Sequence, residues 1–329
     1  MKSKMTKTNN TNNKDYTGNS ERRVGMKRKI AAMISLFLIL SAVGCSSGRG
    51  GGEEIIIMDG QFSEMKLIHQ MVKMLVEQDT DARVLIKDEI SPVNGFNELV
   101  KGNCDLMNSY DGTLLTTYLK MDTKDIPEGQ TLYDFVNETA EKGKGVMLLD
   151  PLGTDNTYSI AVPEKIADQY DLEKISDLVA VAPELVFGAE HEFFSEEGSM
   201  KFNPFVKFYG LKFRESKPVD IGLKYSAVEN GSIDVTEVYA TDGLNKKAHL
   251  KVLEDDKNFF PEYNGALLVR KDLFERYKDK APNLKETLNK LGGIFSNETM
   301  VDLTYAVDVE GKSTQEVAKQ FLQEKGLLE

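Results

Sequence analysis

Tryptophan is absent from this chain of 329 residues, and cysteine and histidine are scarce. The two cysteines, Cys45 and Cys104, are too few for the disulfide framework that stabilises small secreted domains. The three histidines are isolated from one another and lack metal-ligand spacing, so we expect no metal site. Without tryptophan, an aromatic binding surface has to be built from the 12 tyrosines and 16 phenylalanines.

Sequence motifs of catalysis are also missing. The chain has no Gly-x-Ser-x-Gly nucleophile turn and no glycine-rich phosphate-binding loop. Aspartate and glutamate are so frequent, at 53 residues, that pairs of carboxylates arise by chance and carry no information. We therefore expect a protein that is not an enzyme and that binds no cofactor.

Basic residues are fewer than acidic ones: 41 lysines and arginines stand against 53 aspartates and glutamates, which gives a formal net charge of −12. An acidic surface repels nucleic acid and anionic lipid, and it mildly favours cationic ligands. We therefore expect no nucleic acid among the partners.

The apolar run at residues 30–40 is too short to span a bilayer comfortably, which needs about 20 residues. It follows a basic segment at 26–29 and precedes small residues at 41–44, an order typical of a cleaved export signal at 26–44. Small residues directly before a cysteine resemble a bacterial lipobox. Cys45 would then be lipidated and would hold the protein at the extracytoplasmic face of the cell membrane, with a simple secreted form as the alternative.

The segments on either side of the predicted signal differ in composition. Residues 1–25 are polar and rich in Asn, Lys and Thr, which does not fit an export signal. We expect translation to start at Met26, with residues 1–25 as an upstream extension. Residues 45–53 are rich in glycine and serine and predict a flexible tether.

The frame Gly-x-x-Asp-x-x-x-x-Tyr occurs twice, as Gly102, Asp105 and Tyr110 and again as Gly231, Asp234 and Tyr239. In each copy a helical stretch ends at the glycine, and a short strand leads to the tyrosine. Ligands of open α/β sheets bind just beyond the carboxyl ends of strands. The repeat therefore predicts two similar lobes, each offering a tyrosine to a shared cleft.

The rhythm of strands and helices predicts an α/β protein with mostly parallel sheets that are covered by helices on both faces. The apolar segment 148–154 contains Pro and Gly and predicts a crossing between lobes, and residues 250–253 predict the return crossing. The first lobe would comprise 54–153 and 252–329, and the second lobe 154–251.

Four tyrosines stand in motifs that together resemble a known family. The motifs are Tyr110-Asp111-Gly112, Asp155-Asn156-Thr157-Tyr158, Tyr239-Ala240-Thr241-Asp242-Gly243 and Phe259-Phe260-Pro261-Glu262-Tyr263. In this order they resemble the glycine betaine/carnitine/choline-binding proteins of osmoprotectant ABC importers. The similarity runs from about Glu54 to the end of the chain.

The resemblance implies a two-lobed type II periplasmic-binding fold with a tyrosine box. Tyr110 and Tyr263 would belong to the first lobe, and Tyr158 and Tyr239 to the second. Electron-rich ring faces attract a quaternary ammonium, which cannot donate a hydrogen bond. The partners would be a small quaternary ammonium solute and the permease and ATPase subunits of an ABC importer.

Two further residues have counterparts in the family. Thr113 matches a position near the ligand that is Thr or Asp in different members. A neutral hydroxyl would admit carboxylated solutes such as glycine betaine and carnitine, besides choline, whereas Asp would repel them. Gln61, after the first strand, is a candidate amide donor to the same carboxylate, with a solvated turn residue as the alternative.

Other functions remain open from the sequence. The same tyrosines could hold another betaine, such as the larger histidine-derived ergothioneine. A sensor domain or an extracellular enzyme could also use this fold.

Overall fold

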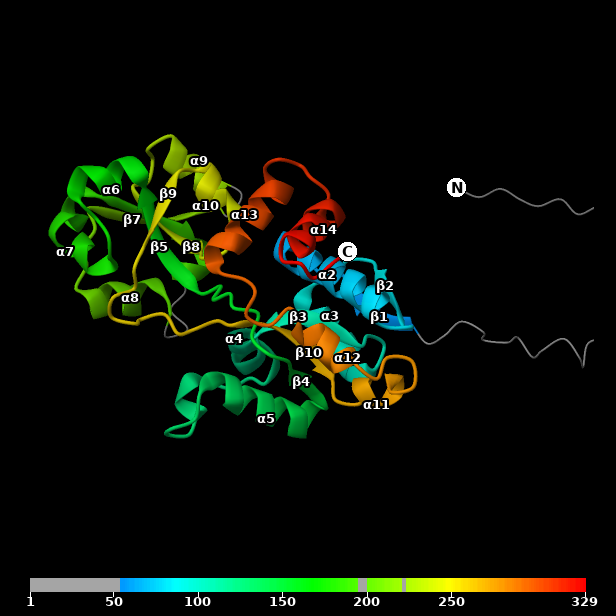
Figure 1. Cartoon of the computed structure of the whole chain (residues 1–329). Helices are drawn as coiled ribbons and strands as arrows, with labels where there is room; N and C mark the ends of the chain where they lie inside the picture. Colours follow the sequence, from blue (N-terminus) through cyan, green and yellow to red (C-terminus); the bar gives the residue numbers. More distant parts are fainter. Residues whose placement is uncertain (1–53, 195–199, 221–222) are drawn as a thin grey trace, which may run out of the picture. The chain divides into compact units, whose positions relative to one another are not determined.

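A computed structural model describes residues 54–194, 200–220 and 223–329, which lie in one compact unit, Gly52–Glu329 (Figure 1). The predicted extension, export signal, tether and lipidation site Cys45 fall outside the described residues.

The first sheet has five strands in the order β2 (Arg83–Lys87), β1 (Glu54–Met58), β3 (Leu106–Tyr110), β10 (Gly265–Arg270) and β4 (Val146–Leu148). β1 runs parallel to β2 and β3, whereas β10 runs antiparallel to β3 and β4. The apolar run of β1 buries Ile55 and Ile57 completely, as expected for a strand covered on both faces.

The second sheet repeats this topology. Its order is β7 (Glu215–Val219), β6 (Val186–Glu190), β8 (Val235–Tyr239), β5 (Tyr158–Pro163) and β9 (Leu250–Leu253). β6 is parallel to β7 and β8, and β5 is antiparallel to β8 and β9. The two similar lobes predicted from the repeat are thus confirmed. Only β10 in the first sheet and β5 in the second run opposite to the other four strands, so the sheets are mixed and, as predicted, mostly parallel. β10 and β5 each follow a segment that crosses between the lobes.

Helices cover both faces of the first sheet. One face carries α2 (Ser63–Asp79), α11 (Leu273–Tyr277), α12 (Leu284–Asn289), α13 (Asn297–Asp308) and α14 (Thr314–Glu324). The other face carries α3 (Pro92–Lys101), the π-helical turn η1 (Leu114–Tyr118) and α5 (Leu132–Lys144). The short α4 (Asp111–Thr113) follows β3 directly, and η2 (Thr123–Asp125) precedes α5. α2 packs between the sheet and the C-terminal helices, and its buried side chains form the centre of this lobe.

The second sheet is covered in the same way. α6 (Glu164–Tyr170), η3 (Ile175–Asp177), α7 (Leu178–Val181), η4 (Ala182–Glu184), η5 (His191–Phe194) and α8 (Phe202–Tyr209) pack on one face. α9 (Lys224–Glu229) and the end of α10 (Gly243–Lys247) pack on the other face. The expectation of helices on both faces is confirmed in both lobes.

The repeated glycine and aspartate have the same structural roles in both lobes. Gly102 and Gly231 end their helices with φ values of 85° and 72°, which a residue with a Cβ rarely adopts. Asp105 then accepts a hydrogen bond from the backbone N–H of Ile56 at 2.8 Å, and Asp234 accepts one from Val186 at 2.9 Å. Each aspartate thus ties its own strand to the neighbouring parallel strand.

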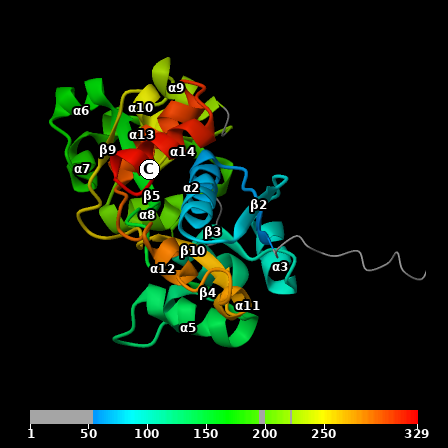
Figure 2. The same ribbon diagram turned by 45° about the vertical axis from the view of Figure 1, so that its right-hand side comes forward.

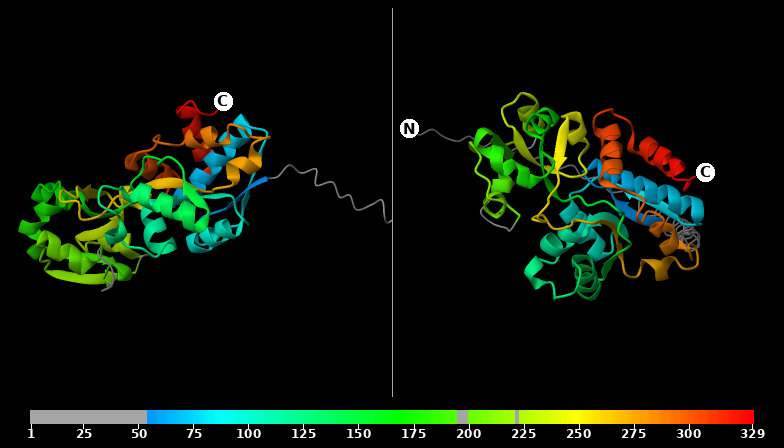
Figure 3. Two further views of the ribbon diagram at one scale, coloured as in Figure 1. Left: turned by 90° about the horizontal axis from the view of Figure 1, so that it is seen from below. Right: turned by 60° about the vertical axis from the view of Figure 1, so that its left-hand side comes forward.

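Two segments cross between the sheets, as the views in Figures 2 and 3 show. They lie between β4 and β5 and between β9 and β10, and they run side by side. Asp155 and Asn264 form an antiparallel bridge, and the backbone N–H of Asn156 donates to the carbonyl of Tyr263 at 3.0 Å. The prediction of a return crossing at 250–253 was wrong, because those residues form β9. A short apolar run fits an edge strand as well as a crossing.

A contact between α10 and α13 also joins the two lobes. Thr304 Oγ1 lies 3.1 Å from the carbonyl oxygen of Thr241, and Lys246 forms an ion pair with Asp302 at 2.6 Å. A Cβ on Gly243 would lie 2.4 Å from the backbone nitrogen of Tyr305. The close packing of these helices therefore requires a glycine at the start of α10.

The two repeated aspartates allow a matched test of the fold. Asp105 also accepts from Arg276 Nη1 at 2.7 Å, whereas Arg214 lies 3.8 Å from Asp234 and is mostly exposed. We expect Asp105→Ala to lower the free energy of unfolding by about 2–4 kcal/mol, and Asp234→Ala by about half as much. Urea unfolding measures both. Equal losses for the two variants would contradict the roles assigned to these carboxylates.

Candidate functional site

The four tyrosines form two ring pairs. The ring centroids of Tyr110 and Tyr263 are 5.5 Å apart with an interplanar angle of 33°, and those of Tyr158 and Tyr239 are 5.4 Å apart at 34°. In the first pair, Tyr110 ends β3 and Tyr263 lies in the crossing segment before β10. In the second pair, Tyr239 ends β8 and Tyr158 begins β5. The similarity of the two pairs follows from the similarity of the two sheets.

Tyr110 and Tyr263 are held by hydroxyl contacts in the first lobe. The Tyr110 hydroxyl donates to Glu64 Oε1 at 2.8 Å, and the hydroxyls of Tyr263 and Thr113 lie 2.7 Å apart. A Cβ on Gly112 would lie only 2.1 Å from the Tyr263 ring. The glycine of the Tyr110-Asp111-Gly112 motif thus leaves space for the second ring.

Tyr158 and Tyr239 face each other because of strand register. They stand directly opposite in the antiparallel pairing of β5 and β8, so their side chains leave the sheet on the same side. The Tyr158 ring also makes edge contacts with Phe193, at 5.8 Å, and with Phe260, at 6.3 Å. The second pair therefore packs against the aromatic core of its lobe.

Polar contacts across the lobes bring the two pairs together. Thr241, two residues after Tyr239, donates its hydroxyl to Glu64 Oε2 at 2.6 Å. The Asn156 side chain lies 3.5 Å from the Tyr110 hydroxyl and accepts from the backbone N–H of Thr241 at 3.4 Å. Glu64 and Asn156 thus connect the end of β3 with the end of β8.

Burial raises the pKa values of all four phenols above their ordinary value of 10. It raises the pKa of Tyr158 to about 12, with the carboxylates of Glu237 and Glu190 adding to the shift. Burial likewise raises the pKa values of Tyr110, Tyr239 and Tyr263.

Two aspartates organise the loops that carry the tyrosines. The fully buried Asp111 accepts from the backbone N–H groups of Gly112, at 2.7 Å, and Asn264, at 2.9 Å. Asp155 accepts from the backbone N–H of Tyr263 at 2.7 Å. Burial raises the pKa of Asp111 to about 6, although these hydrogen bonds oppose the shift.

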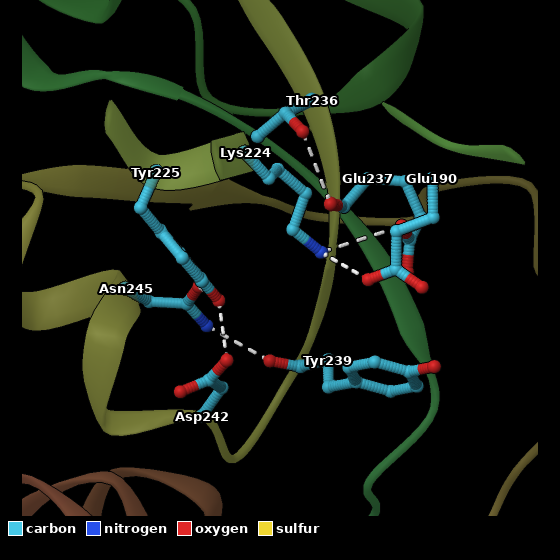
Figure 4. A network of polar contacts seen from close by, with 8 residues as sticks. All are labelled: Glu190, Lys224, Tyr225, Thr236, Glu237, Tyr239, Asp242 and Asn245. Atoms are coloured by element: carbon cyan, nitrogen blue, oxygen red, sulfur yellow. Dashed lines mark hydrogen bonds and ion pairs between the residues drawn. The ribbon is translucent and has the colours of Figure 1, made fainter. Parts of the chain in front are cut away.

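A buried ionic cluster lies beside Tyr239 (Figure 4). Lys224 of α9 is 1% exposed, and its Nζ lies 2.8 Å from Glu190 and 3.6 Å from Glu237. The same ammonium is 5.6 Å from the centroid of the Tyr239 ring. Two carboxylates thus share one buried ammonium at the edge of the second ring pair.

Five of the six predicted ligand-binding residues, the four tyrosines and Thr113, lie in the ring pairs or contact them, and Gln61 does not. Thr113 joins the four tyrosines through its contact with Tyr263. Gln61 is exposed in the turn between β1 and α2, and no described contact connects it with the rings. Sequence reasoning missed Glu64, Asn156 and Thr241. Asn156 and Thr241 belong to two of the four tyrosine motifs, so those motifs could have predicted them. Glu64 lies in no motif.

Two searches of the described residues gave negative results. In the ranges 54–194, 200–220 and 223–329, no group of three or more His, Cys, Asp and Glu side chains is arranged to hold a metal ion. None of the helices in the same ranges has both the length and the apolarity of a membrane span.

Comparison with known families gives one match across most of the chain. Residues 53–324 match the family described as the substrate binding domain of ABC-type glycine betaine transport systems. This range includes both sheets and all four tyrosines.

Relatives with assigned names agree with that match. The carnitine transport binding protein OpuCC of Listeria monocytogenes is 32% identical over 312 residues, covering 92% of this chain and 99% of that protein. The ergothioneine transport permease/ergothioneine binding protein EgtU of Helicobacter pylori is 32% identical over 310 residues. The chain spans only 54% of the length of EgtU.

A solved structure has the same fold. The crystal structure of a glycine betaine/carnitine/choline ABC transporter is 30% identical and superposes with a TM-score of 0.75. The match covers 84% of this chain and 100% of the solved chain. The two-lobed type II periplasmic-binding fold is thus confirmed.

The raised pKa of Asp111 predicts how stability depends on pH. The ordinary pKa is 3.8 and the folded value is about 6, so the folded chain holds a proton between pH 4 and 6 that the unfolded chain releases. The free energy of unfolding therefore falls as pH rises through this window, by up to about 3 kcal/mol from this group. Chemical denaturation at several pH values should show a shallower slope for Asp111→Asn. An unchanged slope would contradict the titration of Asp111.

Proposed function

Because the chain belongs to the family of substrate-binding domains of ABC-type glycine betaine transport systems, we propose that it captures quaternary ammonium solutes for an ABC importer. Glycine betaine, carnitine and choline are the candidate ligands. The domain binds its solute and releases it unchanged, so no catalytic residue is assigned.

The observation that carries this proposal is the arrangement of the two tyrosine pairs. Each ring attracts a quaternary ammonium by roughly 0.5–1 kcal/mol when exposed and about 2 kcal/mol when desolvated. Micromolar affinity requires about 8 kcal/mol. Four half-buried phenols around one cation, desolvated when the lobes close, would supply most of that free energy, although their contributions do not simply add.

Buried carboxylates add to the attraction for a cation. Glu64 is 5% exposed and contacts Tyr110, while Glu190 and Glu237 lie beside the other pair. Negative charge in a site of low dielectric stabilises a cation more strongly than it would in water. Beside the second pair, the Lys224 ammonium offsets one of the two carboxylates, so those surroundings attract a cation only when Glu237 is ionised.

Thr113 and Tyr263 are the proposed contact for a ligand carboxylate. Their two hydroxyls lie 2.7 Å apart, so one of them donates to the other and the second proton is free to reach a carboxylate. Gln61 remains a candidate second donor. It would have to turn inward from its exposed position in the loop before α2.

Ligand capture by lobe closure fits the position of the polar contacts. The proposed lobes, one built on the first sheet and one on the second with the whole of β9 (Leu250–Leu253), exchange contacts through Glu64, Asn156 and Thr241. A solute between the ring pairs would add contacts from both lobes that an open form lacks, so the closed form gains population when ligand binds. The permease would distinguish the two forms.

The proposed partners are the permease and ATPase subunits of the importer. Cys45 is the proposed lipidation site, preceded by the signal at 26–44, and it would anchor the domain to the extracytoplasmic face of the cell membrane. The tether at 45–53 gives the domain reach from that anchor.

A second candidate ligand is another betaine, such as ergothioneine. The 32% identity to the ergothioneine-binding protein of Helicobacter pylori favours it. It carries the same trimethylammonium group with a larger substituent, so it would use the same rings.

The direct experiment is a calorimetric titration of the mature domain with glycine betaine, carnitine, choline and ergothioneine. We expect at least one solute to bind with micromolar affinity. Tyr→Ala at 110, 158, 239 or 263 should weaken that solute about tenfold or more, because each change removes one ring face.

Phenylalanine and a distant tyrosine provide the controls. Tyr158→Phe keeps the ring and should cost less than threefold in affinity, whereas Tyr110→Phe also leaves Glu64 Oε1 without a donor and should cost more. Tyr170→Ala, at the end of α6, should leave the affinity unchanged. If none of the solutes binds, or if the four Ala variants bind as the unaltered domain does, the proposal is wrong.

Thr113→Asp tests the assignment of the carboxylate contact. An aspartate would accept a hydrogen bond from the Tyr263 hydroxyl and would repel a ligand carboxylate. We expect glycine betaine to bind at least tenfold more weakly, while choline binds equally well or better. Thr113→Ser, which keeps the hydroxyl, should behave as the unaltered domain. An unchanged affinity for glycine betaine in Thr113→Asp would refute the assignment.

A further inference from the structure

Glu237 occupies an unusual position for a carboxylate. It stands two residues before Tyr239 on β8, so both side chains leave the same face of the sheet. Tyr158 faces Tyr239 across the strand pair, and Ile160 faces Glu237. The carboxylate is therefore next to the second ring pair and inside the core of its lobe.

The hydrogen bonds of Glu237 are incomplete. Its side chain is 1% exposed, and neither oxygen accepts a hydrogen bond from the described residues. Among the described residues its ion-pair partner is Lys224, at 3.6 Å, and that ammonium is closer to Glu190, at 2.8 Å. A buried carboxylate without hydrogen bonds costs several kcal/mol in general, which calls for a compensating role.

The first lobe has a neutral counterpart at the same position. Asn108 precedes Tyr110 by two residues on β3, as Glu237 precedes Tyr239 on β8. The Asn108 side chain is also fully buried, and its amide is unbonded within the described part of the chain. The two lobes thus place an amide and a carboxylate at equivalent positions below their tyrosines, and only the carboxylate can change its charge.

Both ionisation states of Glu237 are accessible near neutral pH. Burial raises its pKa to about 7, Glu190 adds to the shift, and Lys224 and Lys201 oppose it. The neighbouring elements present these charged groups together with the phenols of Tyr158, Tyr225 and Tyr239, whose pKa values Glu237 helps to raise. The group of Glu190, Lys224 and Glu237 carries a net charge of −1 when Glu237 is ionised and no net charge when it is protonated.

From this placement we propose that Glu237 decides which net charge of solute the site prefers. Ionised Glu237 favours a solute whose only charge is the quaternary ammonium, as in choline. Protonated Glu237 removes the repulsion of a ligand carboxylate, which favours a zwitterion such as glycine betaine. The inference rests on the proposed function, since it assigns a specificity residue to the same site.

Choline and glycine betaine are matched probes, because both carry a trimethylammonium group and only betaine carries a carboxylate. In the unaltered domain we expect choline affinity to rise about fivefold from pH 6 to pH 8, since binding of a cation favours the ionised carboxylate. The ratio of choline affinity to betaine affinity should rise with it. Calorimetry in two buffers of different ionisation enthalpy should detect proton release when choline binds at pH 7.

Glu237→Gln keeps the shape and removes the charge. We expect it to lower the ratio of choline affinity to betaine affinity about tenfold at pH 8 and to remove most of the pH dependence of that ratio. Glu229→Gln makes the same chemical change on the exposed side of α9 and should alter neither quantity. Thermal unfolding checks that both variants fold.

The outcomes separate this inference from the proposed function. If neither solute binds the unaltered domain, the proposed function fails and the inference fails with it. If both bind, but Glu237→Gln keeps the ratio and its pH profile, then Glu237 only supports the fold and the inference alone is wrong. Should the variant not fold, proton release by the unaltered domain decides, because its absence at pH 7 contradicts a titrating Glu237.

Discussion

Several tyrosine rings can bind one small cation together only if the backbone already holds those rings close to one another in the absence of the cation. In this chain the placement depends on strand ends. Tyr110 and Tyr239 end equivalent strands of two equivalent sheets, and Tyr158 faces Tyr239 through the register of an antiparallel pair. The crossing segment brings Tyr263 beside Tyr110, where Gly112 leaves room for its ring. A one-residue shift of register would turn a tyrosine to the opposite face of its sheet and remove it from the site.

Buried acids surround these rings and connect them. Glu64 accepts hydrogen bonds from Tyr110 in the first lobe and from Thr241 in the second. One carboxylate therefore connects the ends of β3 and β8. In the second lobe, Lys224 only partly neutralises Glu190 and Glu237. The rings thus supply a surface that suits any methylated ammonium, whereas the acids make the site sensitive to the remaining charge of the solute. Affinity and specificity would then depend on different residues.

The sequence allowed the lobes to be predicted because the repeat carries backbone requirements. A glycine at positive φ and an aspartate that binds the neighbouring strand can be recognised without knowing the fold. It did not predict the return crossing, because an apolar run such as 250–253 fits β9 equally well. Nor did it predict the bond between Glu64 and Thr241, whose partners are 177 positions apart and share no pattern. Glu237 was one of 53 acids, and what distinguishes it is burial without a hydrogen bond to its carboxylate among the described residues.

The central claim is that phenol faces from both lobes hold one methylated cation together. A crystal structure of the domain with its best quaternary ammonium solute tests this most directly. We expect the ligand nitrogen to lie within about 6 Å of the ring centroids of Tyr110, Tyr158, Tyr239 and Tyr263, the range over which a ring attracts a cation. A nitrogen that contacts the rings of only one lobe, or that binds away from all four, would contradict it.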